Sequence, residues 1–149
     1  MKYSANIVDI LLVEDNPGDV RLTEEALKES KLAVSMRVAR DGIEALAMLR
    51  GEGDYADQPQ PDLILLDLNM PRMDGREVLR QIKSDDRLKH IPVVVLTTSE
   101  AEKDIIQAYG LHANCYITKP VELEEFMKII QSIEGFWLTV VKLPDGLGK

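Results

Sequence analysis

The sequence predicts a doubly wound α/β protein, in which helices cover both faces of a parallel five-stranded sheet. Two observations carry this prediction. Short apolar runs recur along the chain, and each is followed by a segment with apolar residues at three-and-four spacing. Alternation of strand and helix is typical of parallel sheets with right-handed crossovers. The length of 149 residues fits a single domain.

Each predicted strand is a short apolar run, too short for a helix and too continuous for a strand with one face in water. The second and fifth runs are weaker than the others. The five predicted strands are Ile7–Val13, Val34–Ala39, Leu63–Leu66, Val93–Leu96 and Cys115–Thr118.

The predicted helices lie between and after these strands, and polar residues mark where several of them begin. Asn16 before Pro17 supplies a cap for the first helix, Asp41 can cap the second, and Ser99 with Glu102 has the spacing of a capping box. The apolar faces of the five helices consist of Val20, Ala26 and Leu27; Ile43, Ala45, Leu46 and Leu49; Val78, Leu79 and Ile82; Ile105, Ile106 and Tyr109; and Leu123, Phe126, Ile129 and Ile130.

Charge and composition argue against several classes of protein. The 18 basic and 26 acidic residues give a net charge of −8, which opposes binding to nucleic acid, and few aromatic residues are present to stack on bases. No apolar run is long enough to cross a membrane. Cys115 is the single cysteine, and the N-terminus does not resemble a signal peptide. We therefore expect a cytoplasmic protein without disulfides.

Polar and charged side chains follow four of the predicted strands. Glu14 and Asp15 follow the first strand, Asp67 the third, Thr97 the fourth and Lys119 the fifth. In a parallel sheet these positions meet at one edge, where such folds bind ligands. Three carboxylates in one crevice are costly unless cations neutralise them. Mg²⁺ prefers such oxygen ligands, whereas Zn²⁺ fits poorly because no His or Cys belongs to the group.

This arrangement suits phosphoryl transfer. An ionised aspartate can attack phosphorus and form an acyl phosphate, while a metal ion and an ammonium group neutralise the charge on the phosphoryl oxygens. Asp67 is the best candidate nucleophile because it stands alone after the central strand. Glu14 and Asp15 would then hold the metal.

With these residues identified, the chain resembles the receiver domain of two-component response regulators over residues 7–133. The motifs that carry the resemblance are Leu-Leu-Val-Glu-Asp-Asn, Leu-Leu-Asp-Leu-Asn-Met-Pro with Asp-Gly after it, Leu-Thr-Thr-Ser, and Tyr-Ile-Thr-Lys-Pro. The resemblance implies a flavodoxin-like (βα)5 fold with strand order 2-1-3-4-5. It also implies a receiver domain over residues 1–133 and a sensor histidine kinase as phosphoryl donor.

The resemblance assigns a role to each residue of the site. It implies Asp67 as the phosphoacceptor, with Mg²⁺ held by Glu14, Asp15, Asp67 and the backbone carbonyl of Asn69. Thr97 and Lys119 would bind the phosphoryl group, and Tyr116 would be the switch residue that responds to Thr97. The Lys119–Pro120 bond would be cis. Thr98 is bulkier than the Ala or Gly frequent at that position in the family, so we expect it to narrow access to the phosphoryl group and to affect the rate of self-dephosphorylation.

Two segments depart from a minimal receiver. The polar loop Gly51–Pro61 is longer than usual, and we interpret it as a surface insertion in preference to a binding loop. Residues 134–149 form a tail too short for an output domain. Its Phe136 and Trp137 can pack on the body of the protein or form a dimer surface.

The loop and the tail together resemble the stand-alone regulators that partner bacterial phytochrome kinases. This likeness implies a homodimer. A chain without an output domain would signal by protein contact, which the family resemblance assigns to a face of helix 4, strand 5 and helix 5.

Three other functions compete with this interpretation. A phosphatase of the haloacid-dehalogenase kind needs a second Asp where this chain has Asn69, and a P-loop enzyme needs a Gly-rich phosphate-binding motif that the sequence lacks. A receiver-like binding module that works without phosphorylation is the remaining alternative. It would not require all the residues of the site.

Overall fold

The computed structural model describes residues 7–28, 34–68, 74–97, 115–119, 122, 124–125 and 127–128. The strands are β1 (Val8–Val13), β2 (Val34–Ala39), β3 (Leu63–Asp67), β4 (Val93–Thr97) and β5 (Cys115–Thr118). The helices are α1 (Pro17–Lys28), α2 (Gly42–Arg50) and α3 (Gly75–Ser84), with a 3-10 turn η2 (Gly53–Tyr55) after α2. Residues 124–125 and 127–128 are helical within the last predicted helix, whereas the helix predicted around Ile105 lies outside the described residues.

The predicted strands are all present, with small differences at their ends. β1 begins one residue later than predicted, and Ile7 is exposed. β3 and β4 each continue one residue further, so that Asp67 and Thr97 are the last residues of their strands.

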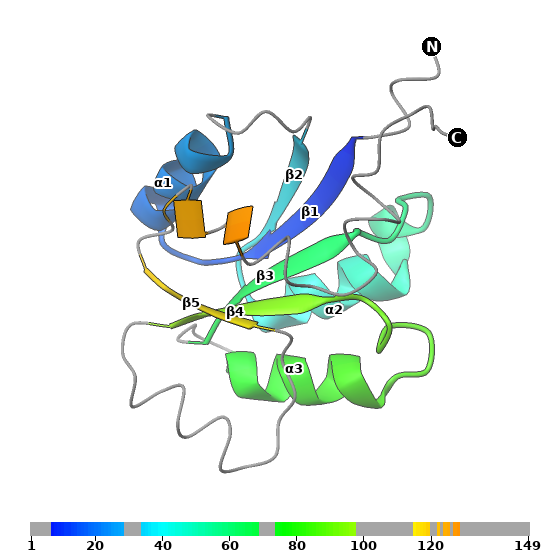
Figure 1. Ribbon diagram of the computed structural model, residues 1–149. Coiled ribbons are helices and arrows are strands. Elements are labelled where there is room, and N and C mark those ends of the chain that lie inside the picture. Colours follow the sequence, from blue (N-terminus) through cyan, green and yellow to red (C-terminus); the bar gives the residue numbers. More distant parts are fainter. Residues whose placement is uncertain are drawn as a thin grey trace, which may run out of the picture.

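The five strands form one parallel sheet in the order β2-β1-β3-β4-β5, as predicted (Figure 1). Val13 of β1 pairs with Ala39 of β2 on one side and with Leu66 of β3 on the other. The carboxyl ends of β1, β2 and β3 therefore lie at the same level of the sheet.

The side chains of the central strands alternate between two cores. Leu11, Val13, Ile64 and Leu66 pack with α2 and α3 on one face. Ile10, Leu12, Leu63 and Leu65 pack with Leu27 and Val20 of α1 on the other, together with Ile117 of β5 and Met127. Figure 1 shows α1 on one side of the sheet and α2 and α3 on the opposite side. Because β3 is buried on both faces, its residues Leu63–Leu66 are continuously apolar.

Side-chain caps fix where the three helices begin. Asn16 Oδ1 accepts a hydrogen bond of 3.0 Å from the Asp19 N–H, and Asp41 Oδ1 accepts one of 2.8 Å from the Glu44 N–H. Both caps were predicted. Asp74 does the same for α3, with a bond of 2.6 Å from the Arg76 N–H.

The loop Gly51–Pro61 is fastened to the sheet by Arg37 of β2. Gly51 ends α2 in the left-handed conformation (φ 66°), which suits a residue without a β-carbon. Further along the loop, the Arg37 guanidinium donates to Gln58 Oε1 (2.8 Å) and to the Pro59 carbonyl (2.9 Å), and it pairs with Asp9 of β1 at 3.3 Å. Most residues of the loop are exposed, as expected for a surface insertion.

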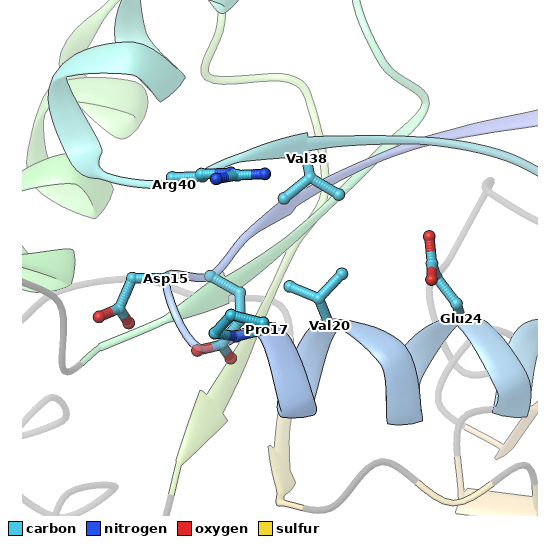
Figure 2. A pocket seen from close by; sticks show the side chains of 7 residues that line it. Asp15, Pro17, Val20, Glu24, Val38 and Arg40 are labelled. Carbon is cyan, nitrogen blue, oxygen red and sulfur yellow. The ribbon is translucent and has the colours of Figure 1, made fainter.

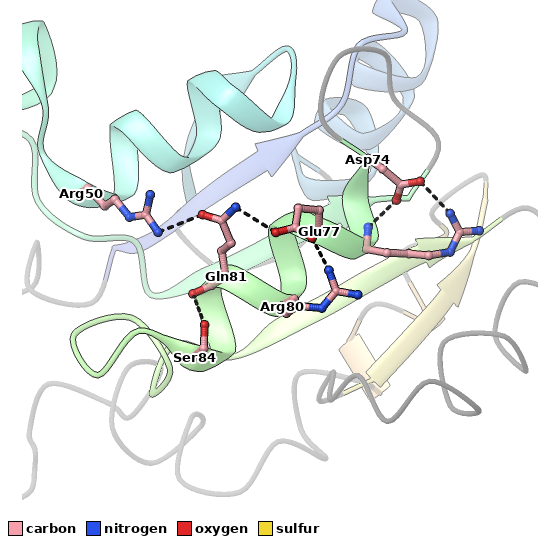
Figure 3. A network of polar contacts seen from close by, with 7 residues as sticks. Arg50, Asp74, Glu77, Arg80, Gln81 and Ser84 are labelled. Carbon is pink, nitrogen blue, oxygen red and sulfur yellow. Dashed lines mark hydrogen bonds and ion pairs between the residues drawn. The ribbon is translucent and has the colours of Figure 1, made fainter.

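A polar network joins α2 to α3 on the face opposite α1 (Figure 3). Arg50 donates to Gln81 Oε1 (3.1 Å) and lies 3.7 Å from Asp85 Oδ2, while Gln81 donates to Glu77 Oε2 (3.0 Å). Glu77 also pairs with Arg80. In the described part of the chain, no helix has both the length and the apolar character needed to cross a membrane.

Candidate functional site

Three carboxylates gather at the carboxyl ends of the two central strands. The Glu14 N–H donates to the Ala39 carbonyl (2.9 Å), which continues the ladder past β1, and Asp67 ends β3. Because Val13 pairs with Leu66, the next residues on each strand, Glu14 and Asp67, stand side by side. Carboxylate oxygens of Glu14, Asp15 and Asp67 lie within 4.8 Å of one another.

Lys119, directly after β5, brings a positive charge to this cluster. Its Nζ lies 2.9 Å from Glu14 Oε1 and 3.5 Å from Asp67 Oδ1. Strand alternation explains how residues from three strands meet. Leu12, Leu65 and Ile117 face α1, and the residues two positions further along are Glu14, Asp67 and Lys119.

A fourth acidic residue, which was not predicted from the sequence, contacts Lys119. Asp19, in the first turn of α1, places Oδ2 2.9 Å from Lys119 Nζ. In the sequence, Asp19 is marked only by its place in the first turn after the Asn16–Pro17 helix start. Its contact with Lys119 depends on which face of the sheet α1 covers, and only the fold shows this.

Burial strengthens the electrostatic interactions in this cluster. The Glu14 side chain is 1% exposed and that of Asp67 is 2% exposed. Burial raises the pKa of Glu14 to about 7. The hydrogen bond from Lys119 acts to lower this pKa, whereas the charge of Asp67 acts to raise it. Burial by itself would lower the pKa of Lys119, but the hydrogen bonds to Asp19 and Glu14 and the charge of Asp67 together raise it above its usual value.

The donor set fits a hard divalent cation. All three clustered residues offer carboxylate oxygens, and no His or Cys of the described chain belongs to the cluster. Mg²⁺ and Mn²⁺ prefer such ligands, whereas structural Zn²⁺ sites are built from Cys and His. Asp15 is exposed, so this side of the cluster is open to solvent.

A hollow of about 270 Å³ adjoins the cluster between α1 and the edge strand β2 (Figure 2). Figure 2 shows Val38 of β2 facing Val20 of α1, with Arg40 and Asp15 at one end and Glu24 at the other. Glu14 and Asp15 belong both to the hollow and to the acidic cluster.

Of the remaining predicted site residues, the structure describes Thr97 and Tyr116. Thr97 ends β4, where it pairs with Thr118 of β5. Tyr116 is half-buried and packs against the core on the α2 and α3 side. The other predicted residues, Asn69, Thr98, Pro120, Phe136 and Trp137, lie outside the described residues.

Comparison with known families and proteins agrees with the resemblance seen in the sequence. The family model of the response regulator receiver domain matches residues 10–131. The response regulator Rcp1 of Synechocystis sp. is 53% identical over 135 residues, which are 91% of this chain and 92% of Rcp1.

Solved structures of similar proteins share the fold. The phosphorylated cyanobacterial phytochrome response regulator RcpA has a TM-score of 0.73 at 55% identity, covering 92% of this chain and 98% of RcpA. The bacteriophytochrome response regulator AtBRR has a TM-score of 0.80 at 48% identity, covering 85% of this chain and 92% of its own. A structure of Rcp1 in a Mn²⁺-bound form matches with a TM-score of 0.72 at 52% identity, covering 92% and 99% of the two chains.

Proposed function

Since the chain belongs to the response regulator receiver domain family, we propose that it accepts a phosphoryl group on Asp67 in a Mg²⁺-dependent reaction. The observation that carries this proposal is the buried Asp67 carboxylate, which ends the central strand β3 beside two more carboxylates and one ammonium group.

The chemistry assigned to Asp67 is nucleophilic attack. A carboxylate oxygen of Asp67 forms a bond to phosphorus as the bond between phosphorus and the leaving group breaks, and the leaving group takes that electron pair. The product is an acyl phosphate. Lys119, 3.5 Å from Asp67 Oδ1, is near enough to donate to an oxygen of the new group after a small shift. We assign the Thr97 hydroxyl to the same group, as the family resemblance implies.

Glu14, Asp15 and Asp67 would hold the metal, with the backbone carbonyl of Asn69 as a further ligand that the family resemblance implies. A bound Mg²⁺ supplies positive charge that offsets the charge of the phosphoryl oxygens. Asp15 is the exposed member of this group, so a phosphoryl donor would approach from its side of the cluster.

The relatives indicate the kind of donor. RcpA and AtBRR are named as response regulators of phytochromes, and we propose a sensor histidine kinase of the phytochrome type as the partner of this chain. We further propose a cytoplasmic homodimer with a receiver at residues 1–133 and a contact through Phe136 and Trp137 in the tail 134–149. The signal would leave through the face of helix 4, strand 5 and helix 5, with Tyr116 and Thr97 as its switch.

The phosphoacceptor proposal is tested by incubating the full chain with acetyl phosphate and Mg²⁺ and measuring its intact mass. We expect one added phosphoryl group, which is absent with a chelator and absent in Asp67→Asn. Asp57→Asn is the matched control, because Asp57 is an exposed aspartate of the loop Gly51–Pro61. An unmodified wild-type chain would favour the phosphorylation-independent binding module instead.

Two further measurements test the partner and the assembly. Phosphotransfer from a phytochrome histidine kinase should be faster than from a chemotaxis kinase at equal concentration, and equal rates would contradict the proposed partner. Light scattering should give the mass of a dimer for the wild type and a lower mass for Trp137→Ala. A wild-type monomer would refute the proposed homodimer.

A further inference from the structure

The ammonium group of Lys119 is shared between two elements of the fold. Its Nζ contacts Glu14 Oε1 after β1 and Asp19 Oδ2 in α1, both at 2.9 Å. The Asp67 oxygen lies further away, at 3.5 Å, beyond the usual range of an N–H···O hydrogen bond. In this state Lys119 is therefore held mainly by Glu14 and Asp19 and only weakly by Asp67.

The position of Asp19 is fixed by two hydrogen bonds of its backbone. The Asp19 N–H donates to Asn16 Oδ1 (3.0 Å), and the Asp19 carbonyl accepts from the hydroxyl of the buried Thr23 (2.9 Å). The Asn16 N–H in turn donates to Glu14 Oε2 (3.2 Å). The contacts form a closed ring of Glu14, Lys119, Asp19 and Asn16, which ties the acidic cluster to the first turn of α1.

We propose that Asp19 is a positioning residue that holds Lys119 in its resting place and competes with the phosphoryl group for it. The proposal rests on the function proposed above, because it assumes that a phosphoryl group arrives at Asp67. Asp19 adds a fourth carboxylate to the site and couples the charge at Asp67 to the start of α1.

The different burial of the two partners decides which one Lys119 leaves. Glu14 is 1% exposed, so leaving its charge without a partner is costly. Asp19 is 33% exposed, and water can replace the ammonium there at small cost. When new negative charge appears on Asp67, Lys119 therefore keeps Glu14 and releases Asp19.

Removing the charge of Asp19 should thus favour the phosphorylated form. We would titrate the full chain with beryllium fluoride, a mimic of the phosphoryl group, at saturating Mg²⁺. Asp19→Asn should bind it about threefold more tightly than the wild type, as expected for loss of a partly exposed ion pair. Glu24→Gln is the matched control, because it removes one charge from an exposed residue of the same helix.

An Asp19→Asn affinity equal to that of the wild type, or matched by Glu24→Gln, would overturn the proposal. Asp19→Glu, which retains the carboxylate, should return the affinity toward the wild-type value, and failure to do so would also count against it.

A second measurement needs no phosphoryl group. The 15N NMR signal of the Lys119 ammonium, assigned by its loss in Lys119→Met, should be visible in the metal-free wild type because ion pairing slows its proton exchange. It should weaken or shift in Asp19→Asn but not in Glu24→Gln, and an unchanged signal would contradict the contact. If Asp19→Asn shows this signal change but the wild type binds no beryllium fluoride, the function proposed for Asp67 fails while the contact between Asp19 and Lys119 is supported.

Discussion

Gly75 packs directly against the backbone of Asp67. A β-carbon on Gly75 would lie 2.5 Å from the Asp67 carbonyl oxygen and 2.6 Å from the Cα of Leu68, which is closer than real contacts allow. The Gly75 N–H also donates to the Leu68 carbonyl (3.1 Å). The first residue of α3 thereby fixes the end of β3, where Asp67 stands.

Substituting Gly75 with Ala should therefore disturb both stability and the site. Because both neighbouring atoms are backbone atoms that cannot rotate away, we expect Gly75→Ala to lower the free energy of unfolding by about 1–3 kcal/mol. Urea denaturation measures this loss, and a Mn²⁺ titration should show weaker binding of the metal ion.

Gly18→Ala, in the first turn of α1, is the control. Its β-carbon would meet only the side-chain oxygen of Asn16, at 3.2 Å. Equal effects of the two substitutions would contradict the close-packing argument.

Asp15 belongs to the acidic cluster, and its substitution should weaken metal binding without affecting stability. Asp15 is exposed, so Asp15→Asn should leave the metal-free stability within about 0.5 kcal/mol of the wild type. Loss of a carboxylate ligand should weaken Mg²⁺ binding by about tenfold or more. Isothermal titration measures the affinity, with the exposed Asp54→Asn as a charge-matched control. Unchanged Mg²⁺ affinity in Asp15→Asn would remove this residue from the ligand set.

The sequence was sufficient to predict the strands and the acidic cluster for a physical reason. Fully buried strands are continuously apolar, so the first polar residue after each run marks the carboxyl end of the strand. Glu14 and Asp67 are such residues. In a parallel sheet these ends must meet at one edge, so no knowledge of the exact register was needed to bring the two residues together.

Asp19 and Arg37 could not be predicted in the same way. The contact of Asp19 with Lys119 depends on which face of the sheet α1 covers and on the alternation that points Lys119 to that face. Arg37 reads as a charged residue within a weak strand, and its partners Gln58 and Pro59 lie in a loop with no periodic pattern. Contacts between distant segments of this kind depend on tertiary structure, which local patterns do not contain.

The fastening of the loop by Arg37 leads to a third prediction. Arg37→Met removes the donors to Gln58 and the Pro59 carbonyl and leaves Asp9 without its pair. We expect a loss of about 1–3 kcal/mol in unfolding free energy and faster amide hydrogen exchange in the loop Gly51–Pro61. The control is Arg21→Met, which breaks only the exposed Arg21–Glu25 pair on α1. If loop exchange is as slow in Arg37→Met as in this control, Arg37 does not hold the loop.

Lys83 should make the stability depend on pH in the alkaline range. Its Nζ donates to the carbonyls of Lys89 (3.3 Å) and Ile91 (3.2 Å), and burial lowers its pKa below the ordinary value of 10.5. The unfolded chain then keeps this proton to higher pH than the folded chain. Between the folded pKa and 10.5 the unfolded state binds more protons, so the unfolding free energy should rise with pH. Urea denaturation from about pH 8 upward should show this rise in the wild type and a flatter curve in Lys83→Met.

Lys89 provides the control for this prediction. The pKa of exposed Lys89 is instead raised, by its hydrogen bond to Asp86 and by the charge of Asp86. The stability that Lys89 adds is present below its ordinary pKa and lost above it, so Lys89→Met should leave the rise in place. The same flattening in both variants would show that burial of Lys83 is not the cause.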